Sequence, residues 1–322
     1  MSIEGSLIGL AVGDALGAPV EFLDLRTIRA RYGEAGIADL EPWGGVPAGS
    51  YTDDTQMSLS TAQGIIRAFR ERGAGTDFHK HLIESVYEEY LRWFKNQSLA
   101  HERRAPGNTC LSALASGRMG TAEHPINDSK GCGGVMRTAP VGLVFSGTEA
   151  FRIGTDCAAI THGHPSGYLT AGFIAELISY LLEGKRLVEG IDLCLDTLKG
   201  YGRHDETTAK LSLVLHLAAQ NIAPVDAIPK IGAGWVAEEA LAIAVFCALR
   251  FEDNFRGGVL AAVNHSGDSD STGSITGAIL GAKLGVASIP ARWVQRLENS
   301  AKIKQIAKGF SLILEGSEIK RE

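Results

Sequence analysis

The chain contains 322 residues, of which 45% are hydrophobic and 21% are charged. This balance excludes a mainly disordered protein, because it supplies enough apolar side chains for a large core. The formal net charge of -6 disfavours nucleic-acid binding, since domains that bind nucleic acid carry a basic stripe against the phosphates. Glycine is in excess, with 39 residues, or about 12% of the chain against an average of about 7%. Because prolines number only 10, the glycines predict tight turns, ligand contacts or close helix packing rather than collagen or disorder.

Cysteine usage and the apolar segments bear on the cellular compartment. The cysteines are scattered without a C-x-x-C pair, which predicts reduced thiols in a cytoplasmic protein: Cys110, Cys132, Cys157, Cys194 and Cys247. The first residues lack the basic region of a signal peptide. The most apolar windows, 167–182 and 240–249, are too short for a bilayer span or are interrupted by Glu176. We therefore expect a cytoplasmic protein without membrane contact.

Glycine recurs every fourth residue in two segments near opposite ends of the chain. The two ladders are Gly5, Gly9, Gly13 and Gly17 in the first segment, and Gly273, Gly277, Gly281 and Gly285 in the second. On a helix this spacing leaves a bare ridge that lets a neighbouring helix approach closely. Each glycine costs a helix about 0.5–1 kcal/mol relative to alanine, so two whole ladders predict a packing role.

Helical periodicity runs through the rest of the chain. Apolar residues recur at helical spacing, and alternating runs with hairpin turns are missing. The pattern predicts helices over residues 57–69, 81–95, 169–182, 191–198, 209–219, 238–250 and 292–307. We therefore expect an all-α protein. No linker or composition shift divides the sequence, which predicts one compact domain over residues 1–322.

Three acidic clusters interrupt this apolar pattern. They are Asp14 with Glu21, then Thr52-Asp53-Asp54, and finally Asp268-Ser269-Asp270-Ser271. The second and third clusters each precede a predicted helix, where Asp caps open N–H groups and suits the helix dipole. Asp53 and Gln56 even have capping-box spacing. Helix capping therefore accounts for either cluster taken alone.

Taken together, the clusters favour a metal site. Both helix starts carry two carboxylates and hydroxyls, more than capping requires, and adjacent carboxylates repel unless a cation neutralises them. Oxygen ligands without clustered Cys or His suit Mg²⁺ or Mn²⁺. Four carboxylates suit two divalent ions better than one. Residues 268–273 do not match a calcium EF-hand, because no Glu stands at position 12 of the loop.

These motifs resemble those of a known family. The segments 13–17 (Gly-Asp-Ala-Leu-Gly), 52–55 (Thr-Asp-Asp-Thr) and 267–273 (Gly-Asp-Ser-Asp-Ser-Thr-Gly) look like the defining motifs of the ADP-ribosylglycohydrolases. Residues 131–137 and 161–168 are similar to the two substrate-site loops of that family. The five motifs stand in the expected order over most of the chain. The resemblance implies a compact all-α fold with a binuclear metal cleft.

The resemblance also implies roles for the acidic residues. Two Mg²⁺ ions, or Mn²⁺, would be bound by Thr52, Asp53, Asp54, Asp268, Asp270 and Ser271. Glu21 is the candidate that positions or activates water beside these ions. Asp14 either orients this corner of the site or is a buried structural carboxylate. Some relatives carry an Asp in a loop comparable to residues 104–109, which contain no acid here, so Glu21 is the main catalytic candidate.

The two middle motifs are candidate substrate-binding loops. Backbone N–H groups of a glycine loop are free to cradle a diphosphate, which assigns Gly131, Cys132 and Gly133 to this role. His162 matches a substrate-contacting position of the family, although a hydrogen-bonded structural histidine is an equal alternative. Tyr168 is a candidate substrate contact with core packing as its alternative. Arg137 is either a phosphate ligand or a structural residue, and His164, before Pro165, is expected to be structural.

The resemblance implies a metal-dependent hydrolase that removes ADP-ribose from a modified protein. The motifs at 268–272 and 161–165 look more like the branch that cleaves the N-glycosidic bond to arginine. The alternatives are another ADP-ribosyl linkage, on serine, a nucleobase or a small metabolite, or a non-catalytic ADP-ribose-binding or crystallin-like protein. The expected partner is an ADP-ribosylated protein or ADP-ribose conjugate, and no nucleic acid is expected.

Overall fold

The computed structural model describes residues 2–73, 77–220 and 222–318. Within these ranges there is no β-strand, only isolated bridges between Trp43 and Val46 and between Gly131 and Val236, so the all-α prediction is confirmed. The α-helices are α1 (Ile3–Gly17), α2 (Leu25–Tyr32), α3 (Asp53–Arg70), α4 (Phe78–Asn96), α5 (Asn108–Ala115), α6 (Gly147–Ala159), α7 (Pro165–Leu182), α8 (Leu187–Lys199), α9 (Asp205–Ala219), α10 (Pro224–Ile231), α11 (Ala237–Arg250), α12 (Phe255–Val263), α13 (Ser269–Leu284), α14 (Ala291–Arg296) and α15 (Ser300–Glu318). Short 3₁₀ helices are η1 (Val135–Arg137), η2 (Ala139–Leu143) and η3 (Val286–Ser288).

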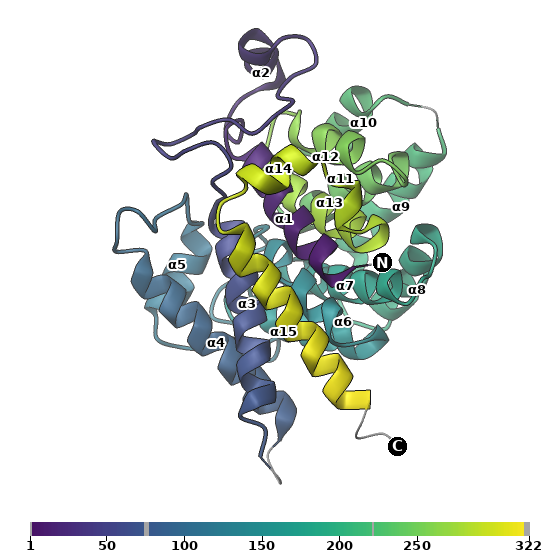
Figure 1. Cartoon of the computed structure of the whole chain (residues 1–322). Helices are drawn as coiled ribbons and strands as arrows, with labels where there is room; N and C mark the ends of the chain where they lie inside the picture. The colour runs from purple at the N-terminus through teal and green to yellow at the C-terminus, as the bar shows by residue number, and fades with distance from the viewer. Residues whose placement is uncertain (1, 74–76, 221, 319–322) are drawn as a thin grey trace.

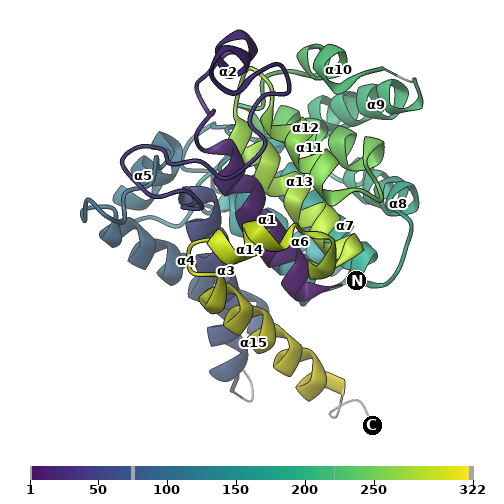
Figure 2. The same cartoon turned by 45° about the horizontal axis from the view of Figure 1, so that its top comes forward.

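The two glycine ladders face each other across the contact between α1 and α13. A Cβ atom on Gly9 would lie 2.2 Å from the carbonyl oxygen of Gly277, and one on Gly13 would lie 2.0 Å from that of Gly273. Gly5 faces Gly281 in the same way, so the two helices run antiparallel. Figures 1 and 2 show them side by side at the centre of the molecule. The predicted packing role is confirmed for the ladder glycines within α1 and α13, whereas Gly285 is the C-cap of α13 with φ +80°.

This contact also fixes the position of the turn after α1. Gly17 lies against the start of α13, since a Cβ atom there would stand 2.4 Å from the backbone nitrogen of Asp270. Pro19 cannot continue the helix, and the chain turns through hydrogen bonds from the N–H groups of Val20 and Glu21 to the carbonyl of Gly17. The residues after α1 therefore lie beside the start of α13.

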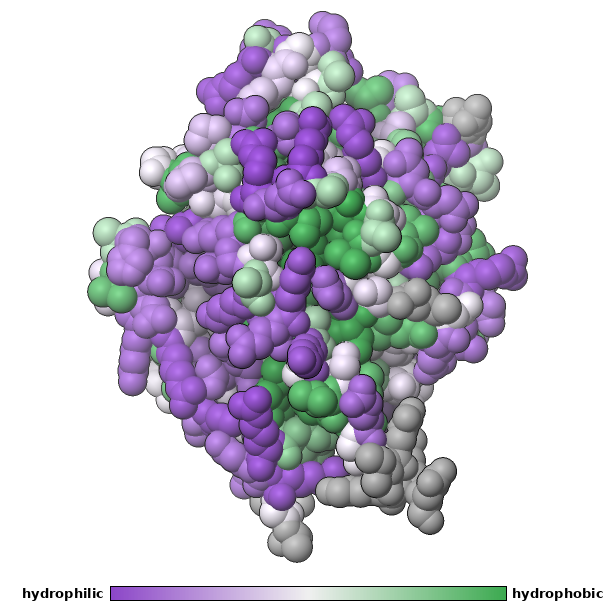
Figure 3. All heavy atoms as spheres, viewed as in Figure 1, coloured by the Kyte–Doolittle hydropathy of each residue, from purple (hydrophilic) through white to green (hydrophobic). Residues whose placement is uncertain are grey.

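The other helices surround this pair. A continuous cluster of buried apolar side chains reaches from α1 to α15. Helix α15 runs along α3, and α2 stands apart at the top of the molecule (Figures 1 and 2). Hydrophilic residues cover most of the face in Figure 3, with hydrophobic residues exposed mainly near its middle. In the described ranges, no helix combines the length and the apolar character needed to cross a bilayer.

The prediction of one continuous helix over residues 292–307 is wrong. The chain leaves the helical path at residues 297–299, and α14 and α15 are separate helices. Asn299 adopts the left-handed conformation, with φ +52°, which Asn tolerates better than most residues. The break lets Glu298 reach Arg104, whose guanidinium donates to both of its carboxylate oxygens at 3.1 and 3.2 Å. Apolar periodicity continues through this break, which is why the sequence pattern did not reveal it.

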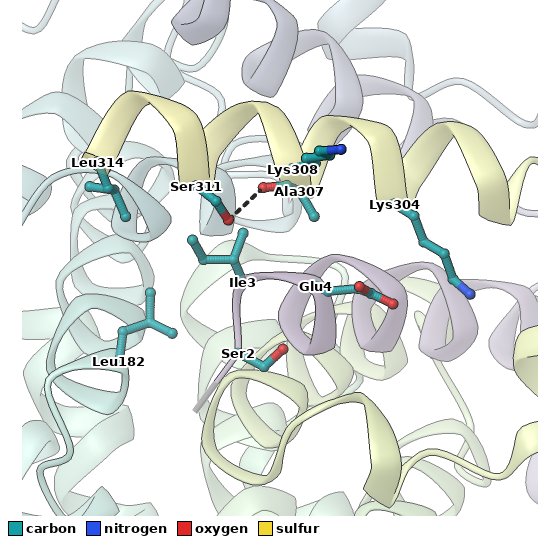
Figure 4. Close-up of a pocket in the computed structure, with 9 residues that line it drawn as sticks. All are labelled: Ser2, Ile3, Glu4, Leu182, Lys304, Ala307, Lys308, Ser311 and Leu314. Atoms are coloured by element: carbon teal, nitrogen blue, oxygen red, sulfur yellow. Dashed lines mark hydrogen bonds between the residues drawn. The ribbon is translucent and has the colours of Figure 1, made fainter. Parts of the chain in front are cut away.

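A cavity of about 740 Å³ lies at the N-terminal end of α1. Figure 4 shows it between α1 and α15, with Glu4 on one side and Lys304 on the other. Helix α1 has 15 residues, so roughly 22 Å of helix separates this cavity from the turn that carries Glu21. The cavity is therefore remote from the acidic clusters.

Helix packing at the ladders makes a direct stability prediction. In Gly9→Ala the new methyl group would overlap the Gly277 carbonyl, so α1 and α13 must separate, at a cost of about 1–3 kcal/mol or more. Gly316→Ala is the matched control, because Gly316 lies exposed in α15 with no atom within 4 Å of its Cβ position. Thermal denaturation should show a lower Tm for the first variant and an unchanged or slightly higher Tm for the second. Equal melting of both variants would contradict the close packing.

Candidate functional site

The three acidic clusters meet at one corner of the fold, formed by the turn after α1 and the starts of α3 and α13. Carboxylate oxygens of Glu21, Asp268 and Asp270 all lie within 4.8 Å of one another, close enough to share a metal ion. The charge of Asp270 also acts on Asp53 and Asp54 and raises the pKa of both, after the larger effect of burial. Residues separated by more than 200 positions in the sequence therefore form one group, which we call the acidic corner.

The start of α3 differs from the capping-box expectation. Thr52, not Asp53, is the N-cap, and its side chain accepts a hydrogen bond from the N–H of Asp54. This leaves Asp53 and Asp54 in the first helical turn with carboxylates that the cap does not use. Asp53 accepts one bond from the N–H of Gly107 at 3.3 Å. Oδ2 of Asp54 is buried without a hydrogen-bond partner in the described structure, which is costly unless a ligand satisfies it.

Asp14 holds the start of α3 in place within this corner. It is fully buried in α1, and its carboxylate accepts bonds from the N–H groups of Thr52 and Thr55, each at 2.9 Å, and from the Thr55 hydroxyl. Both interpretations of Asp14 therefore hold, since a buried carboxylate bonded to backbone also orients the start of α3. Burial, followed by the charge of Asp270, raises its pKa to about 7.

The start of α13 is held against a neighbouring loop. Asp268 is the N-cap and its side chain accepts from the N–H of Ser271, so capping is part of its role. The N–H of Asp268 donates to the carbonyl of Ala233 at 2.8 Å. Gly267 makes this approach possible, because a Cβ atom there would lie 1.9 Å from the same carbonyl oxygen. Asp270 accepts a second bond from Ser271 at 2.9 Å.

The electrostatics of the acidic corner fit a cation. Its six carboxylates are Asp14, Glu21, Asp53, Asp54, Asp268 and Asp270, and in the described part of the chain none pairs with Lys, Arg or His. Burial raises the pKa of all six, and repulsion from neighbouring carboxylates adds to this at every one except Asp270; the pKa of Glu21 rises to about 11. Such a charge surplus, together with the unpartnered Asp54 oxygen, suits hard divalent ions with oxygen ligands.

The glycine loop at 131–134 touches the acidic corner through one side chain. The Cys132 thiol donates to Oδ2 of Asp268 at 2.8 Å, and the Ser271 hydroxyl lies 3.6 Å from the same sulfur. Burial and the nearby aspartates raise the pKa of Cys132 well above its usual range. The thiol is therefore protonated, which argues against a nucleophilic role.

His162 lies beneath this loop. A Cβ atom on Gly133 would come 2.9 Å from Cε1 of the imidazole, so the loop can take this path only with glycine there. Nδ1 of His162 is bonded to the Thr161 hydroxyl at 2.8 Å. Burial, then the charge of Arg137, lowers the pKa of His162 to about 3, so the ring is neutral at physiological pH. Its other nitrogen faces Gly131 and Gly133.

Arg137 and His164 are structural in their contacts. Arg137 is fully buried, donates to the Cys157 carbonyl and the Thr161 hydroxyl, and lies 4.3 Å over the Tyr90 ring. It is thus an internal support for the segment that carries His162 rather than a phosphate ligand. His164 is the N-cap of α7, with Nδ1 accepting from the N–H of Ser166.

Tyr168 lies apart from the acidic corner. It is half-buried on α7, and the charges that influence its hydroxyl are those of Arg203 and Glu123. In the described residues, no hydrogen bond or ring contact joins Tyr168 to the acidic residues.

Two aromatic residues beside the acidic corner were missed in the sequence. Phe22 directly follows Glu21, and its ring stacks on Trp235, with centroids 5.4 Å apart and planes at 18°. Phe22 has φ +50°, in the left-handed region. The available sequence signal was proximity alone, since Phe22 adjoins a recognised acid, whereas residues 233–236 belong to none of the motifs.

Metal binding should depend on pH with a definite sign. The acidic carboxyls titrate near their ordinary values in the unfolded chain but hold protons to higher pH when folded, Asp14 to about 7. Stability without metal is therefore full below the unfolded values and is lost as pH rises through the folded ones. Mg²⁺ must displace these protons, so its effect on Tm should be larger near pH 8 than near pH 5.5.

A thermal-shift titration with Mg²⁺ and Mn²⁺ at the two pH values measures this difference. Asp270→Asn is the informative variant, because Asp270 acts on most of the other carboxylates in the corner. It should melt at higher temperature than the parent without metal and gain little from added ions. A Mg²⁺ effect independent of pH would speak against metal binding by these carboxylates.

Comparisons with known proteins agree with this geometry. The sequence profile described as ADP-ribosylglycohydrolase matches residues 2–320. ADP-ribosyl-[dinitrogen reductase] glycohydrolase of Rhodospirillum rubrum is 26% identical over 91% of this chain and 89% of its own length. ADP-ribosylarginine hydrolase Tri1 of Serratia proteamaculans (strain 568) is also 26% identical, over 94% of this chain and 77% of that protein. ADP-ribosylhydrolase ARH3 of Bos taurus is 23% identical over 97% of this chain and 93% of that protein.

A solved structure shares the fold. It is described as an ADP-ribosylglycohydrolase-related protein complex, and it superposes with a TM-score of 0.75 at 24% identity, covering 97% of each chain. The profile match extends over nearly the whole sequence, and the motifs within it form the acidic corner and the glycine loop. The chain belongs to the ADP-ribosylglycohydrolase family.

Proposed function

We propose that this protein is a metal-dependent hydrolase that removes ADP-ribose from a modified protein by cleaving the N-glycosidic bond to arginine. The proposal rests on the acidic corner, where six carboxylates meet and none pairs with a positively charged side chain among the described residues. It adjoins a glycine loop of the kind that leaves backbone N–H groups accessible to phosphate. A charged, oxygen-rich corner beside such a loop suits a nucleotide sugar held by divalent ions.

The metal ligands would be the residues at the two helix starts. Two Mg²⁺ ions, with Mn²⁺ as the substitute of similar ligand preference, would be held by Thr52, Asp53, Asp54, Asp268, Asp270 and Ser271. When bound, such ions supply positive charge that orients ribose hydroxyls and stabilises charge developing at the scissile bond. Asp14 holds the first of these helix starts in place through Thr52 and Thr55.

Glu21 is the proposed catalytic residue. Its carboxylate lies in the group formed with Asp268 and Asp270, beside the proposed metal ligands. Burial, followed by the charges of Asp270 and Asp268, raises its pKa to about 11, so Glu21 holds a proton in the metal-free protein. The positive charge of bound ions would lower this pKa and free the carboxylate to act as a base. In this position Glu21 would accept a proton from the water molecule whose oxygen attacks the anomeric carbon. The bond from that carbon to the guanidino nitrogen breaks, and this nitrogen takes up the proton as the arginine side chain leaves.

The remaining substrate contacts would come from the two middle motifs. Gly131, Cys132 and Gly133 present backbone to the diphosphate, and Cys132 links this loop to Asp268. Neutral His162 sits behind the loop, where it adds a hydrogen-bonding nitrogen without adding charge. Tyr168 would contact the end of the substrate farthest from the ions. The five free cysteines support a reducing, cytoplasmic location.

Arginine is proposed as the leaving group for two reasons. The Serratia relative that covers most of this chain is named an ADP-ribosylarginine hydrolase. The motifs Asp-Ser-Asp-Ser-Thr at 268–272 and Thr-His-Gly-His-Pro at 161–165 resemble those of the arginine-directed branch. Hydrolysis of serine-linked ADP-ribose, or of a nucleobase or metabolite conjugate, is the competing activity to measure.

Release of free ADP-ribose tests the function directly. The protein should liberate ADP-ribose from an ADP-ribosyl-arginine conjugate with Mg²⁺ and not after chelation, and more slowly from a serine conjugate. Glu21→Gln should lower kcat by about 10²–10⁴-fold while the Mg²⁺ thermal shift persists. If the Mg²⁺ shift disappeared as well, Glu21 would be a metal ligand instead.

Asp53→Ala separates catalysis from binding. It should abolish turnover, and binding of ADP-ribose can be followed calorimetrically in the same variant. A parent protein that binds ADP-ribose but releases none from either conjugate would contradict the proposal and leave a non-catalytic binding protein.

A further inference from the structure

An exposed aromatic pair stands beside the acidic corner. The Phe22 side chain is 74% exposed and Trp235 is 42% exposed, and their rings stack on each other. Single exposed apolar side chains are ordinary on protein surfaces. Here the two rings cover each other on one side and leave much of their remaining area in water. Because they lie next to a buried charged site, they form a surface suited to a ligand.

The loop that carries Trp235 is fixed to both parts of the proposed site. Asp268 donates its N–H to the Ala233 carbonyl at 2.8 Å, and Gly131 forms a backbone bridge with Val236. The same loop is braced by Glu239, whose carboxylate accepts from the N–H groups of Ala233 and Gly234 at 3.0 and 3.3 Å. Trp235 therefore has a defined position relative to the start of α13 and the glycine loop.

Phe22 is held in place by the turn after α1. Val20 is fully buried and Leu23 packs against the core, so the chain is anchored on both sides of Glu21 and Phe22. Between these anchors Phe22 adopts φ +50°, which residues with bulky side chains rarely do. The carboxylate of Glu21 reaches Asp268 and Asp270, whereas the adjacent Phe22 ring lies in solvent against Trp235. Glu21 thus belongs to the acidic corner, and the adjacent Phe22 belongs to the surface beside it.

The chemistry of the leaving group indicates which ligand the aromatic pair would bind. A modified protein is too large to enter the fold, so its side chain must reach Glu21 from the surrounding surface, where the aromatic pair lies. A guanidinium group is planar, cationic and weakly hydrated, and it stacks on aromatic faces. Nearby carboxylates further favour a cation there. A serine leaving group has neither a charge nor a planar face.

We propose that Phe22 and Trp235 form a stacking platform for the guanidinium group of the modified arginine. The inference rests on the proposed function, and it deepens that function by assigning the preference for arginine to Phe22 and Trp235, which lie outside the five motifs named in the sequence analysis. The platform selects the leaving group and leaves the ribose and diphosphate contacts unchanged.

Turnover of two linkages tests the platform. In Phe22→Ala and Trp235→Ala, kcat/KM on the ADP-ribosyl-arginine conjugate should fall about three- to tenfold, while kcat/KM on the serine conjugate stays unchanged. Phe22→Tyr keeps a ring and should behave like the parent. Leu312→Ala, which removes another exposed apolar side chain, 59% exposed on α15, is the matched control. Equal losses on both linkages would overturn the platform, because the pair would then only position Glu21.

Binding of a leaving-group analogue tests the platform without turnover. Agmatine carries a guanidinium group, and 1,4-diaminobutane carries an ammonium group in its place. Calorimetry with ADP-ribose and Mg²⁺ present should show that the parent binds agmatine more tightly than 1,4-diaminobutane. This difference in affinity should disappear in Phe22→Ala and Trp235→Ala.

The two proposals fail in different ways. A parent that releases no ADP-ribose from the arginine conjugate contradicts the proposed function, and the agmatine titration still decides the platform. Agmatine affinity that is equal in the parent and both alanine variants overturns the platform even if the parent is an active arginine-linked hydrolase.

Discussion

Backbone contact between α1 and α13 requires that no side chain stand between them. At Gly5, Gly9 and Gly13 a single Cβ atom would lie 2.0–2.3 Å from a carbonyl oxygen of the opposing helix. Alanine at those positions would therefore push the helices apart, although alanine is the better helix former. The turn that carries Glu21 and the start of α13 meet at the end of this contact, so the arrangement of the acidic corner depends on glycines that take no part in its chemistry.

The acidic corner lowers the stability of the folded protein. Burial raises the pKa of each carboxyl group, and repulsion raises it further for all but Asp270, which means that folding disfavours the charged state that a metal needs. Hydrogen bonds offset part of this cost, among them those from Thr52 and Thr55 to Asp14. Active sites commonly concentrate such unfavourable groups, and the large apolar core around this one supplies the compensating stability.

Sequence reasoning reached the parts of this fold that have a period or a chemical motif. The ladders predicted close helix contact because glycine at four-residue spacing weakens a helix unless a neighbouring helix packs against it. The aspartates predicted a shared site because they exceed what capping requires. Other features lack such signals. The break at 297–299 interrupts a continuing apolar pattern, and it depends on a pairing of Glu298 with Arg104 from a distant segment. The stack of Phe22 on Trp235 depends on one left-handed residue and on a loop whose path only tertiary structure determines.

The pairing of the ladders also has a consequence for biosynthesis. Helix α1 leaves the ribosome well before its partner α13, which begins at Ser269, more than 250 residues later. An almost wholly apolar helix with a bare glycine face must therefore persist without its partner until most of the chain has been made. Contacts of such large sequence separation form slowly, and exposed apolar segments aggregate while they wait. The same contact that unites the acidic corner therefore leaves α1 in need of protection until α13 has been made.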